Sequence, residues 1–547
     1  MSAHFILPTK PCHNCRKRRW KCDRSLPVCQ KCLHSGSECL GYGKLLVWNQ
    51  GVARRGKMMG KSFEDVEKTK KENQGHLVHQ ASKESPKNSL GVEIPRTESD
   101  FSSSQDLVKG ERADMRIQWP LIDPLVKDMG RQSRYYLYHF ATQLCADMVV
   151  VDGPGQNPIR DLVPATSGNP LLLQVMLANA ALHVYNISSE PAKPSIYQPD
   201  RKLCLVAYYG SVSRFGGPFT TSYRDALVAK QQALSHLSQS VAFVNPSNID
   251  FILAAILLFI NFDLVESGKD KWKVHMDGAT KLISLLGTPP YEQNPMSQLR
   301  KCLLADFLVF FILGSTLNFY AGPKKLLPDT IDVEPILQYA ETNNYLSCPG
   351  PLLRVMLESF DLPDLRETKS IPTKVQDQVQ KLLESALAFD PVKWATRDFR
   401  PASPFEDLEK RALIASAHKA AVCIYVARVL PAGNPLLNPI HGTALVSLTG
   451  LADEVVYNIS CIKPGDTVFK CICWPLFLAG AESEDLAQRA YILQLLDAQW
   501  NEMYWGYICT VQNVLEAIWS YRELYEELDD YCWVDDVKKM GTELLIA

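Results

Sequence analysis

Apolar residues recur at helical spacing through most of the chain, from about Trp119 onward. Tyr136, Phe140 and Leu144 follow one another at intervals of four, which is typical of one face of a helix. Residues 171–185 are rich in Ala and Leu and predict a second helix. Alternating strand patterns are nearly absent. The pattern therefore predicts a large all-α domain of roughly a dozen or more helices.

Two further helices have identifiable features. Ser403, Pro404 and Glu406 form a start signal, because Ser can cap, Pro suits the first helical position and Glu completes a capping box. The helix that they open should run to about Leu430, since a proline follows it. A helix over 223–244 should carry one apolar side, made of Ala226, Ala229, Ala233, Leu234 and Leu237.

The N-terminal part of the chain has a different pattern. Residues 44–60 are basic, and residues 61–116 are rich in Ser, Lys and Glu with few large apolar side chains. Such a segment buries too little surface to offset its ordering entropy, so it predicts a disordered linker. The predicted organisation is a small Cys-rich domain, a linker and a large helical domain, at 1–43, 44–116 and 117–547.

Composition adds an asymmetry of charge that the total hides. Hydrophobic residues make up 46% and charged residues 22%, which excludes a wholly disordered chain. The formal net charge is −2, yet residues 1–60 hold 12 Lys/Arg against 2 Asp/Glu, and the remainder holds 46 against 58. The positive excess lies at the N-terminal end, and the acidic remainder is not expected to bind DNA itself.

No export signal or membrane segment is predicted. Residues 1–10 contain only Phe5-Ile6-Leu7 as an apolar run, which is too short for the core of a signal peptide. The longest apolar runs, at 251–260 and 303–313, fall well short of the ~20 residues that span a bilayer. In the reducing compartment that this implies, clustered cysteines are more often metal ligands than disulfides.

Six of the 16 cysteines lie within residues 12–39 in a doubled pattern. Thiolates at Cys-x2-Cys spacing converge on one zinc ion, which binds four ligands as a tetrahedron. Six thiolates can complete the ligands of two zinc ions if two of the thiolates each bind both ions. This predicts a cluster with two Zn²⁺ per chain. The alternative is one four-cysteine site with two thiols left over, and the internal symmetry favours two metals. Each half reads Cys-x2-Cys-x6-Cys, and the six residues are Cys12, Cys15, Cys22, Cys29, Cys32 and Cys39.

A dense positive charge lies between the second and third cysteines. It far exceeds the formal −2 of a cluster of two zinc ions and six thiolates. A short helix here would present its positive end to phosphates and to guanine O6 and N7 in a major groove. A nuclear-import signal or a solvated charge run is the alternative, and import is compatible with DNA binding. The candidate DNA-binding residues are Arg16, Lys17, Arg18, Arg19 and Lys21.

On these residues the N-terminus resembles the fungal binuclear zinc-cluster (Zn2Cys6) transcription factors. The match covers the six cysteines, the basic run, Asp23 after the third cysteine and Pro27 before the fourth. It implies a zinc-dependent, sequence-specific DNA-binding regulator of RNA polymerase II transcription that acts in the nucleus. Double-stranded DNA and transcription co-regulators are the partners that it implies.

The resemblance also implies roles for single residues. Base contacts would come from Arg18 and Arg19, with Arg16 and Lys21 nearer the phosphates. Family members commonly read CGG-type triplets, often with Lys at the main reading position, where Arg19 stands. Arginine makes the same guanine contact in bidentate form. The first cysteine of each half, Cys12 or Cys29, would bind both ions. One ion would also bind the other two cysteines of the first half, Cys15 and Cys22. The second ion would also bind the other two cysteines of the second half, Cys32 and Cys39.

The region from about residue 120 resembles the helical fungal-specific transcription factor domain that often follows this cluster. The basic stretches at 41–46 and 54–57 are similar to those of regulators likened to acriflavine-sensitivity control proteins. The segments that carry the likeness of the large domain are 157–160, 171–185, 272–279 and 474–482.

Two other functions compete with this interpretation. A catalytic helical domain would need a convergent motif, and no His-Glu-x2-His or Gly-x-Ser-x-Gly pattern occurs. His275 is more often a packed helix residue than a base, and Cys471 and Cys473 are more often core thiols than ligands. A metal store or sensor would not need the arginine run. The sequence therefore predicts a regulator that is not an enzyme.

The oligomeric state stays open at this point. Residues 61–75 lack apolar a and d positions, so no coiled coil is evident after the cluster. Either the helical domain forms a homodimer or the chain binds a single half-site.

Overall fold

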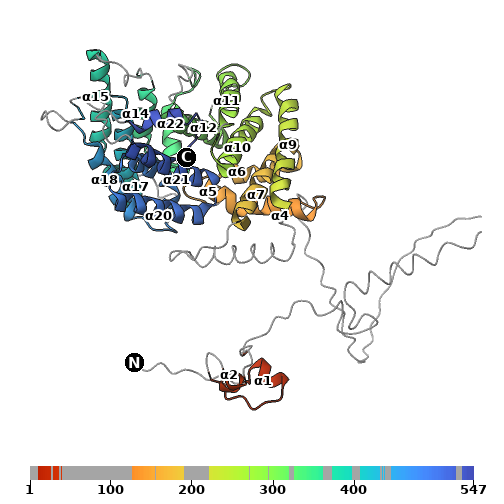
Figure 1. Ribbon diagram of the computed structural model, residues 1–547. Helices are drawn as coiled ribbons and strands as arrows, with labels where there is room; N and C mark the ends of the chain where they lie inside the picture. Colours follow the sequence, from red (N-terminus) through yellow and green to blue (C-terminus); the bar gives the residue numbers. More distant parts are fainter. Residues whose placement is uncertain are drawn as a thin grey trace, which may run out of the picture. The chain divides into compact units, whose positions relative to one another are not determined.

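The computed structural model divides the chain into two compact units, Met1–Asp114 and Met115–Ala547, which are described separately (Figure 1). The linker predicted over 44–116 lies outside the residues that the structure describes. The described residues are 10–25, 29–35, 39, 126–153, 155–189, 221–269, 271–293, 295–318, 326–360, 362, 372–396, 407–430, 434, 436–437, 445–524, 532–541 and 543–547.

The small unit holds two short helices of the same design, α1 (His13–Lys17) and α2 (Gln30–His34). Each begins directly after the first cysteine of a Cys-x2-Cys pair. That cysteine is the N-cap, and its sulfur accepts a hydrogen bond at 3.4 Å from the backbone N–H of the second cysteine. The doubled sequence pattern therefore forms a doubled local structure.

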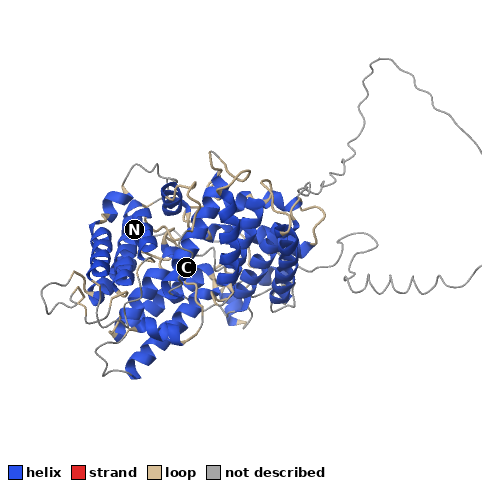
Figure 2. Cartoon of the chain, turned by 90° about the horizontal axis from the view of Figure 1, so that it is seen from above, coloured by secondary structure: helices blue, strands red, loops and turns tan. Residues whose placement is uncertain are grey.

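The large unit (here called the body) consists of helices and loops in its described parts, and no strand occurs there (Figure 2). This confirms the mostly α prediction. In addition to a π-helix (Phe140–Leu144) and two 3₁₀ turns (Val163–Ser167 and Phe469–Cys471), its helices are α4 (Arg131–His139), α5 (Cys145–Asp147), α6 (Pro158–Asp161), α7 (Pro170–Ser189), α9 (Ser222–Val241), α10 (Ile249–Glu266), α11 (Trp272–Leu286), α12 (Gln298–Asn318), α13 (Glu334–Asn343), α14 (Gly350–Ser359), α15 (Thr373–Ala388), α16 (Pro391–Ala395), α17 (Leu408–Ala427), α18 (Leu448–Ser460), α19 (Cys473–Glu482), α20 (Leu486–Met503), α21 (Gly506–Leu524) and α22 (Trp533–Lys539).

The body is built around α10, which is apolar on every side. It contacts α7, α9, α11, α12 and α21, so that it is buried along nearly its whole length. A second group of helices packs around α17, which contacts α14, α15, α16, α18 and α19. A helix without a polar face is typical of the core of a large domain.

The predicted helix over 171–185 is α7, which begins at Pro170 as the rule for first helical positions predicts. By length and composition α7 could also cross a membrane. However, 72% of its most apolar window is buried inside the body, where it packs against α9 and α10. The structure thus gives α7 the environment of a core helix.

Tyr136, Phe140 and Leu144 are buried as their spacing predicts. The helix that carries them is not α throughout, because it takes the π form from Phe140 to Leu144. In the later helix, α17, the N-cap is Asp407, whose carboxylate accepts from the backbone N–H groups of Glu409 and Lys410. Ser403 lies outside the described residues, and α17 ends at Ala427, three residues before the predicted end.

The predicted apolar side of α9 is correct in part. Ala226, Ala229 and Ala233 are buried, and their small side chains let α9 lie close against α7. Leu237 is half-buried. Leu234, however, is 41% exposed, so it does not lie on the buried side with the three alanines as predicted. It follows Ala233 by one residue, which on a helix is a turn of about 100° away from the buried side.

N-terminal and C-terminal parts of the body are tied together through buried polar contacts. The Nε2 atom of His183 in α7 lies 2.6 Å from the carbonyl oxygen of Met503 at the end of α20. The Lys470 ammonium donates to the carbonyl oxygens of Ala146 and Val149, at 2.6 Å each. The body can therefore fold completely only after segments more than three hundred residues apart in the sequence have come into contact.

A buried ion pair also lies in this core, and it gives a stability prediction. Arg428 and Glu482 form a bidentate pair, and the Trp533 indole N–H donates to the same carboxylate at 2.8 Å. Arg428→Met should lower the free energy of unfolding by about 3–5 kcal/mol, because it leaves a buried carboxylate without its cation. Urea denaturation of the full chain measures this. The double variant Arg428→Met/Glu482→Gln should recover most of the loss, and an equal loss in both variants would contradict the assignment.

Candidate zinc cluster and nucleic-acid interface

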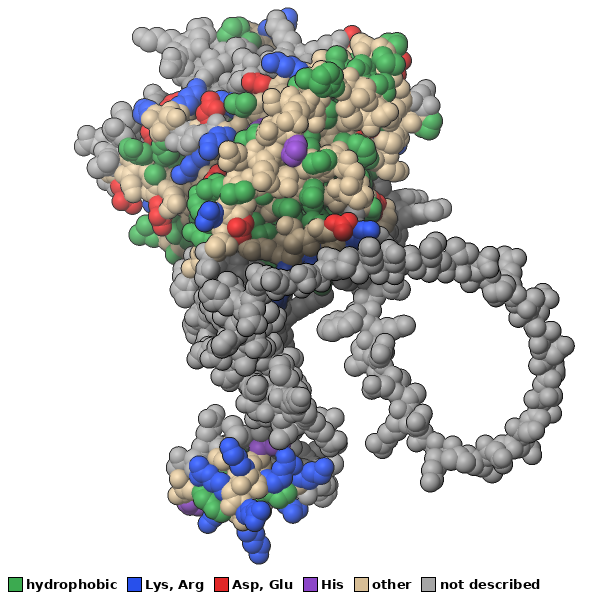
Figure 3. Space-filling view, turned by 90° about the vertical axis from the view of Figure 1, so that its right-hand side faces the viewer, with side chains coloured by type: hydrophobic (Ala, Val, Ile, Leu, Met, Phe, Trp, Pro, Cys, Tyr) green, Lys and Arg blue, Asp and Glu red, His purple; other side chains and the backbone are tan. Residues whose placement is uncertain are grey.

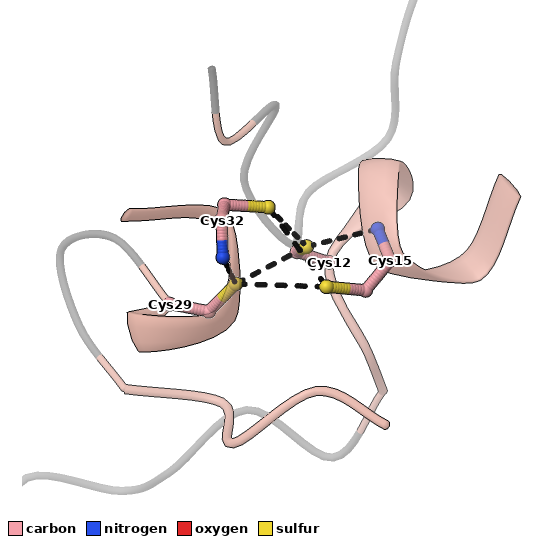
Figure 4. Close-up of side chains that lie close together, drawn as sticks. All are labelled: Cys12, Cys15, Cys29 and Cys32. Atoms are coloured by element: carbon pink, nitrogen blue, oxygen red, sulfur yellow. Dashed lines mark hydrogen bonds between the residues drawn. The ribbon is translucent and has the colours of Figure 1, made fainter. Parts of the chain in front are cut away.

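Four cysteine sulfurs meet between α1 and α2 (Figure 4). The Sγ of Cys12 lies 3.6 Å from that of Cys29 and 3.7 Å from that of Cys32. The Sγ of Cys15 lies 3.7 Å from that of Cys29 and 3.8 Å from that of Cys32. All four side chains are fully buried within the small unit. These residues, called the thiol tetrad below, come from the two Cys-x2-Cys pairs.

The spacing within the thiol tetrad fits zinc. Two sulfurs that share a tetrahedral zinc ion, each ~2.3 Å from it, lie ~3.8 Å apart, and the four sulfur–sulfur distances are 3.6–3.8 Å. Thiolates are also the donors that structural zinc sites use most. Both the type of ligand and the distances between the sulfurs therefore fit zinc.

The other two predicted ligands lie next to the tetrad. The sulfur of Cys22 accepts a hydrogen bond at 3.4 Å from the backbone N–H of Cys12 and lies within 4.8 Å of the Cys29 sulfur. Cys39 is half-buried and packs against the tetrad. The structure thus gathers four of the six predicted ligands closely and places the remaining two beside them.

Zinc binding at this site is coupled to protons. Burial raises the pKa of Cys12 and Cys29, and raises that of Cys15 to about 12. Burial also acts to raise the pKa of Cys22, but hydrogen bonds from the backbone of Cys12 and Arg24 outweigh it and bring the pKa to about 7. Because zinc binds thiolates, filling the site releases protons, and the affinity for zinc falls as the pH falls.

Asp23 organises the second half of the small unit. Its carboxylate accepts from the Ser25 hydroxyl and from the backbone N–H groups of Gln30 at 3.0 Å and Lys31 at 3.1 Å. These hydrogen bonds hold the pKa of Asp23 well below its usual range, and the one from Ser25 contributes most. The carboxylate therefore stays charged and holds the first turn of α2 near Cys29.

The end of α1 places Arg19 in an unusual backbone conformation. The backbone N–H of Trp20 donates to the carbonyl of Cys15 at 2.8 Å, and that of Arg19 donates to Arg16 at 3.4 Å. This pair of bonds is a Schellman motif, in which the residue after the C-cap is left-handed. Arg19 has a φ of 56°, where glycine is usual. The motif turns the chain sharply after α1 and sets the Arg19 side chain beyond the helix end.

All five predicted DNA-binding residues are exposed, and Figure 3 shows Lys and Arg side chains over the small unit. The Arg18 guanidinium lies 4.9 Å from the centre of the Trp20 ring, which packs against the tetrad. A cation over an aromatic face has fewer conformations. Three more basic side chains of the small unit are exposed, those of Lys10, Arg24 and Lys31, and only their charge marks them in the sequence. Lys31 lies 5.9 Å from the same ring.

The candidate reactive residues of the body are packed. His275 stacks on Phe259, with ring centres 5.0 Å apart, and burial lowers the pKa of His275 to about 4. Cys471 and Cys473 are buried, and the Cys471 thiol donates to the carbonyl of Tyr345 at 2.8 Å. These contacts agree with the interpretation of these residues as core. The thiols of Cys461, Cys509 and Cys532 are only half-buried.

Both units of the chain match known protein families. Residues 10–47 match the family model described as the fungal Zn(2)-Cys(6) binuclear cluster domain, which binds two zinc ions. Residues 135–547 match the model described as the fungal specific transcription factor domain. No solved structure matches the chain.

Two curated relatives are similar along almost the whole chain. The acriflavine sensitivity control protein acr-2 of Neurospora crassa is 29% identical, over 98% of this chain and 97% of its own. A phomenoic acid biosynthesis cluster-specific transcriptional regulator of Leptosphaeria maculans is 21% identical, over 93% of this chain and 85% of its own. Since the second family model covers most of the chain and the first covers the thiol tetrad, the protein belongs to the fungal Zn2Cys6 transcription factors and is a zinc-dependent, DNA-binding transcription regulator.

Proposed function

We propose that the small unit reads a CGG-type triplet in the major groove of DNA, with guanine contacts from Arg18 and Arg19. Arg16 and Lys21 contact the flanking phosphates in this proposal, and Lys17 belongs to the same basic face. The observation that carries the proposal is the exposed basic end of α1, which projects from a unit held together by the thiol tetrad.

The geometry of α1 supports this division of labour. A major groove about 12 Å wide admits a helix end, and a bidentate arginine pairs with O6 and N7 of guanine. Arg18 rests on Trp20, and the Schellman motif sets Arg19 beyond the helix. A side chain already held in place loses less entropy when it binds a base. Basic residues outside this end would supply affinity without reading sequence.

We propose that Cys12 and Cys29 bridge the two zinc ions. Three of the four short sulfur–sulfur distances support this, because they join thiols that would share an ion: Cys12 with Cys29, Cys15 with Cys29, and Cys12 with Cys32. The fourth, between Cys15 and Cys32, joins thiols that would belong to different ions. Cys22 would complete the first ion's ligands and Cys39 the second's.

The acidic body has a regulatory role in this proposal, and it is not catalytic. Its net negative charge disfavours contact with DNA phosphates, so it leaves DNA binding to the small unit. The chain would act in the nucleus, where it would bring co-regulators to the genes that the small unit selects. The family of the body and the names of the relatives support this role.

Selection of bound DNA from a random pool, using the full zinc-loaded chain, tests the proposal. The expected outcome is enrichment of sequences that contain a CGG-type triplet. The same selection with the metal removed by a chelator should enrich nothing, because the small unit depends on zinc for its fold. Enrichment of an unrelated motif, or of the same sequences without metal, would contradict the proposal.

A further inference from the structure

A cavity of about 330 Å³ lies between α11 and α12 of the body, two helices labelled in Figure 1. Its deep walls are apolar and include Trp272, Met276 and Phe311, all of which are buried. Small-molecule sites are typically cavities of about 300–1,000 Å³, lined by apolar and aromatic side chains with a few polar groups. The volume and the lining of this cavity therefore match those of a small-molecule site.

The aromatic wall of the cavity is held in place from two directions. A Cβ atom at Gly314 would lie 2.3 Å from the Cη2 atom of Trp272, so only a glycine lets the indole lie directly against α12. The indole N–H donates to the carbonyl oxygen of Glu543 at 3.4 Å. A wall that is already fixed does not have to be ordered when a ligand binds, which favours affinity.

Ser315 supplies a polar group at depth. It lines the cavity and is 3% exposed, yet its hydroxyl makes no hydrogen bond within the described parts of the chain. The hydroxyl of Thr280, on the opposite helix, is already used, because it donates to the carbonyl oxygen of Met276 at 2.9 Å. A serine hydroxyl can donate and accept, so Ser315 suits a ligand hydroxyl in either direction.

The charged residues of the cavity balance one another. Lys273, Asp277 and Lys281 line it and follow at intervals of four along α11, so neighbouring charges of opposite sign lie one helical turn apart. The Lys273 ammonium also pairs with the Glu543 carboxylate at 2.6 Å. Two positive and two negative groups leave no net charge that would attract an ion. A charged ligand would also lose its hydration against the apolar walls, which is costly.

We propose that this cavity binds a neutral aromatic alcohol of about two rings, whose hydroxyl forms a hydrogen bond with Ser315. An apolar cavity of about 150 Å³ holds one benzene ring, so a cavity of about 330 Å³ has room for two. The rings would contact the faces or edges of Trp272 and Phe311 and the sulfur of Met276, all of which favour aromatic partners. The inference concerns the body alone, and it stands whether or not the small unit reads a CGG-type triplet.

Titration calorimetry of the full zinc-loaded chain with 2-naphthol tests the proposal, since this two-ring alcohol is neutral at pH 7. We expect one site per chain and a dissociation constant between about 10 µM and 1 mM. Naphthalene, which lacks the hydroxyl, should bind about 3- to 10-fold more weakly. The anion 2-naphthoate and the cation of 2-naphthylmethylamine should each bind at least ~10-fold more weakly than 2-naphthol, because their charges must be desolvated.

Three variants assign the binding to this cavity. Ser315→Ala should bind 2-naphthol and naphthalene equally, because it lacks the hydroxyl that distinguishes them. Thr280→Trp should bind neither, since the indole fills the cavity. The matched control is Ser284→Trp, one turn further along α11, where the serine is exposed and outside the cavity. That control should bind both compounds as the unsubstituted chain does, and circular dichroism should show the same helix content in all three variants.

Four outcomes would each overturn the proposal. The first is no binding of 2-naphthol at millimolar concentration. The second is tighter binding of either charged compound than of 2-naphthol. The third is an unchanged preference for 2-naphthol over naphthalene in Ser315→Ala. The fourth is equal binding by Thr280→Trp and Ser284→Trp, which would place the ligand elsewhere on the chain.

Discussion

Arg19→Gly is expected to weaken binding to a selected DNA site by about 1–3 kcal/mol, while binding to unrelated DNA changes little. The reason is the loss of a bidentate guanine contact at the end of α1. Glycine is the informative replacement, because Arg19 has a positive φ that glycine adopts without strain. The variant therefore removes the side chain and relaxes the backbone. Fluorescence anisotropy with labelled duplexes of selected and scrambled sequence measures both affinities.

Two companion variants separate base reading from phosphate contact. Lys21→Ala should weaken binding to all sequences to a similar degree and lower the salt dependence of binding by about one phosphate contact. Arg19→Lys should retain part of the preference, since lysine also donates to guanine. If Arg19→Gly weakened binding to selected and scrambled DNA equally, Arg19 would be a phosphate contact and the proposed reading position would be wrong.

Cys29→Ser is expected to abolish specific DNA binding and to leave at most one zinc ion on the chain. The Cys29 sulfur lies 3.6 Å from that of Cys12 and 3.7 Å from that of Cys15, so its loss opens the centre of the thiol tetrad. Metal binding contributes on the order of 10 kcal/mol to folding in small zinc domains. The described residues of the small unit hold no other hydrophobic core that could replace it. Native mass spectrometry counts the ions, and anisotropy measures the binding.

Cys461→Ser is the control for this experiment. Cys461 is a half-buried thiol of the body that lies outside the small unit, so its loss should leave two zinc ions and full DNA binding. Cys22→Ser should cause a smaller loss of zinc than Cys29→Ser, because Cys22 would bind one ion rather than two. Equal loss of zinc from Cys22→Ser and Cys29→Ser would contradict the bridging role of Cys29.

The small unit was the part of the chain most open to prediction, because its signals are local. The Cys-x2-Cys spacing fixes a turn of helix and brings two thiols together, and the doubled pattern does so twice. The basic run was equally visible, and all five of its charged side chains are exposed. The left-handed backbone conformation of Arg19 could not be predicted from the sequence, because it depends on the hydrogen bonds at the C-terminal end of α1.

The body shows where periodicity stops being informative. The helices were predicted because apolar residues repeat at helical spacing, and most apolar helix residues are indeed buried. Leu234 was placed on the same side as the three alanines because the pattern cannot distinguish a side chain that meets α7 from one that lies just past it. The π-helix at 140–144 also escaped notice, since an interval of four suits either kind of helix locally. Both errors come from tertiary packing, which a linear pattern does not contain.

The contact between His183 and Met503 has a consequence for how the protein is made. The two residues are 320 positions apart, and ribosomes add about 5–20 residues per second, so α7 waits roughly 15–60 s for its partner. During that time the apolar surfaces of α7 and α10 have no complete core to enter. The nascent chain is therefore a natural client for chaperones, and a premature stop before α20 would leave a product destined for degradation rather than a shorter regulator.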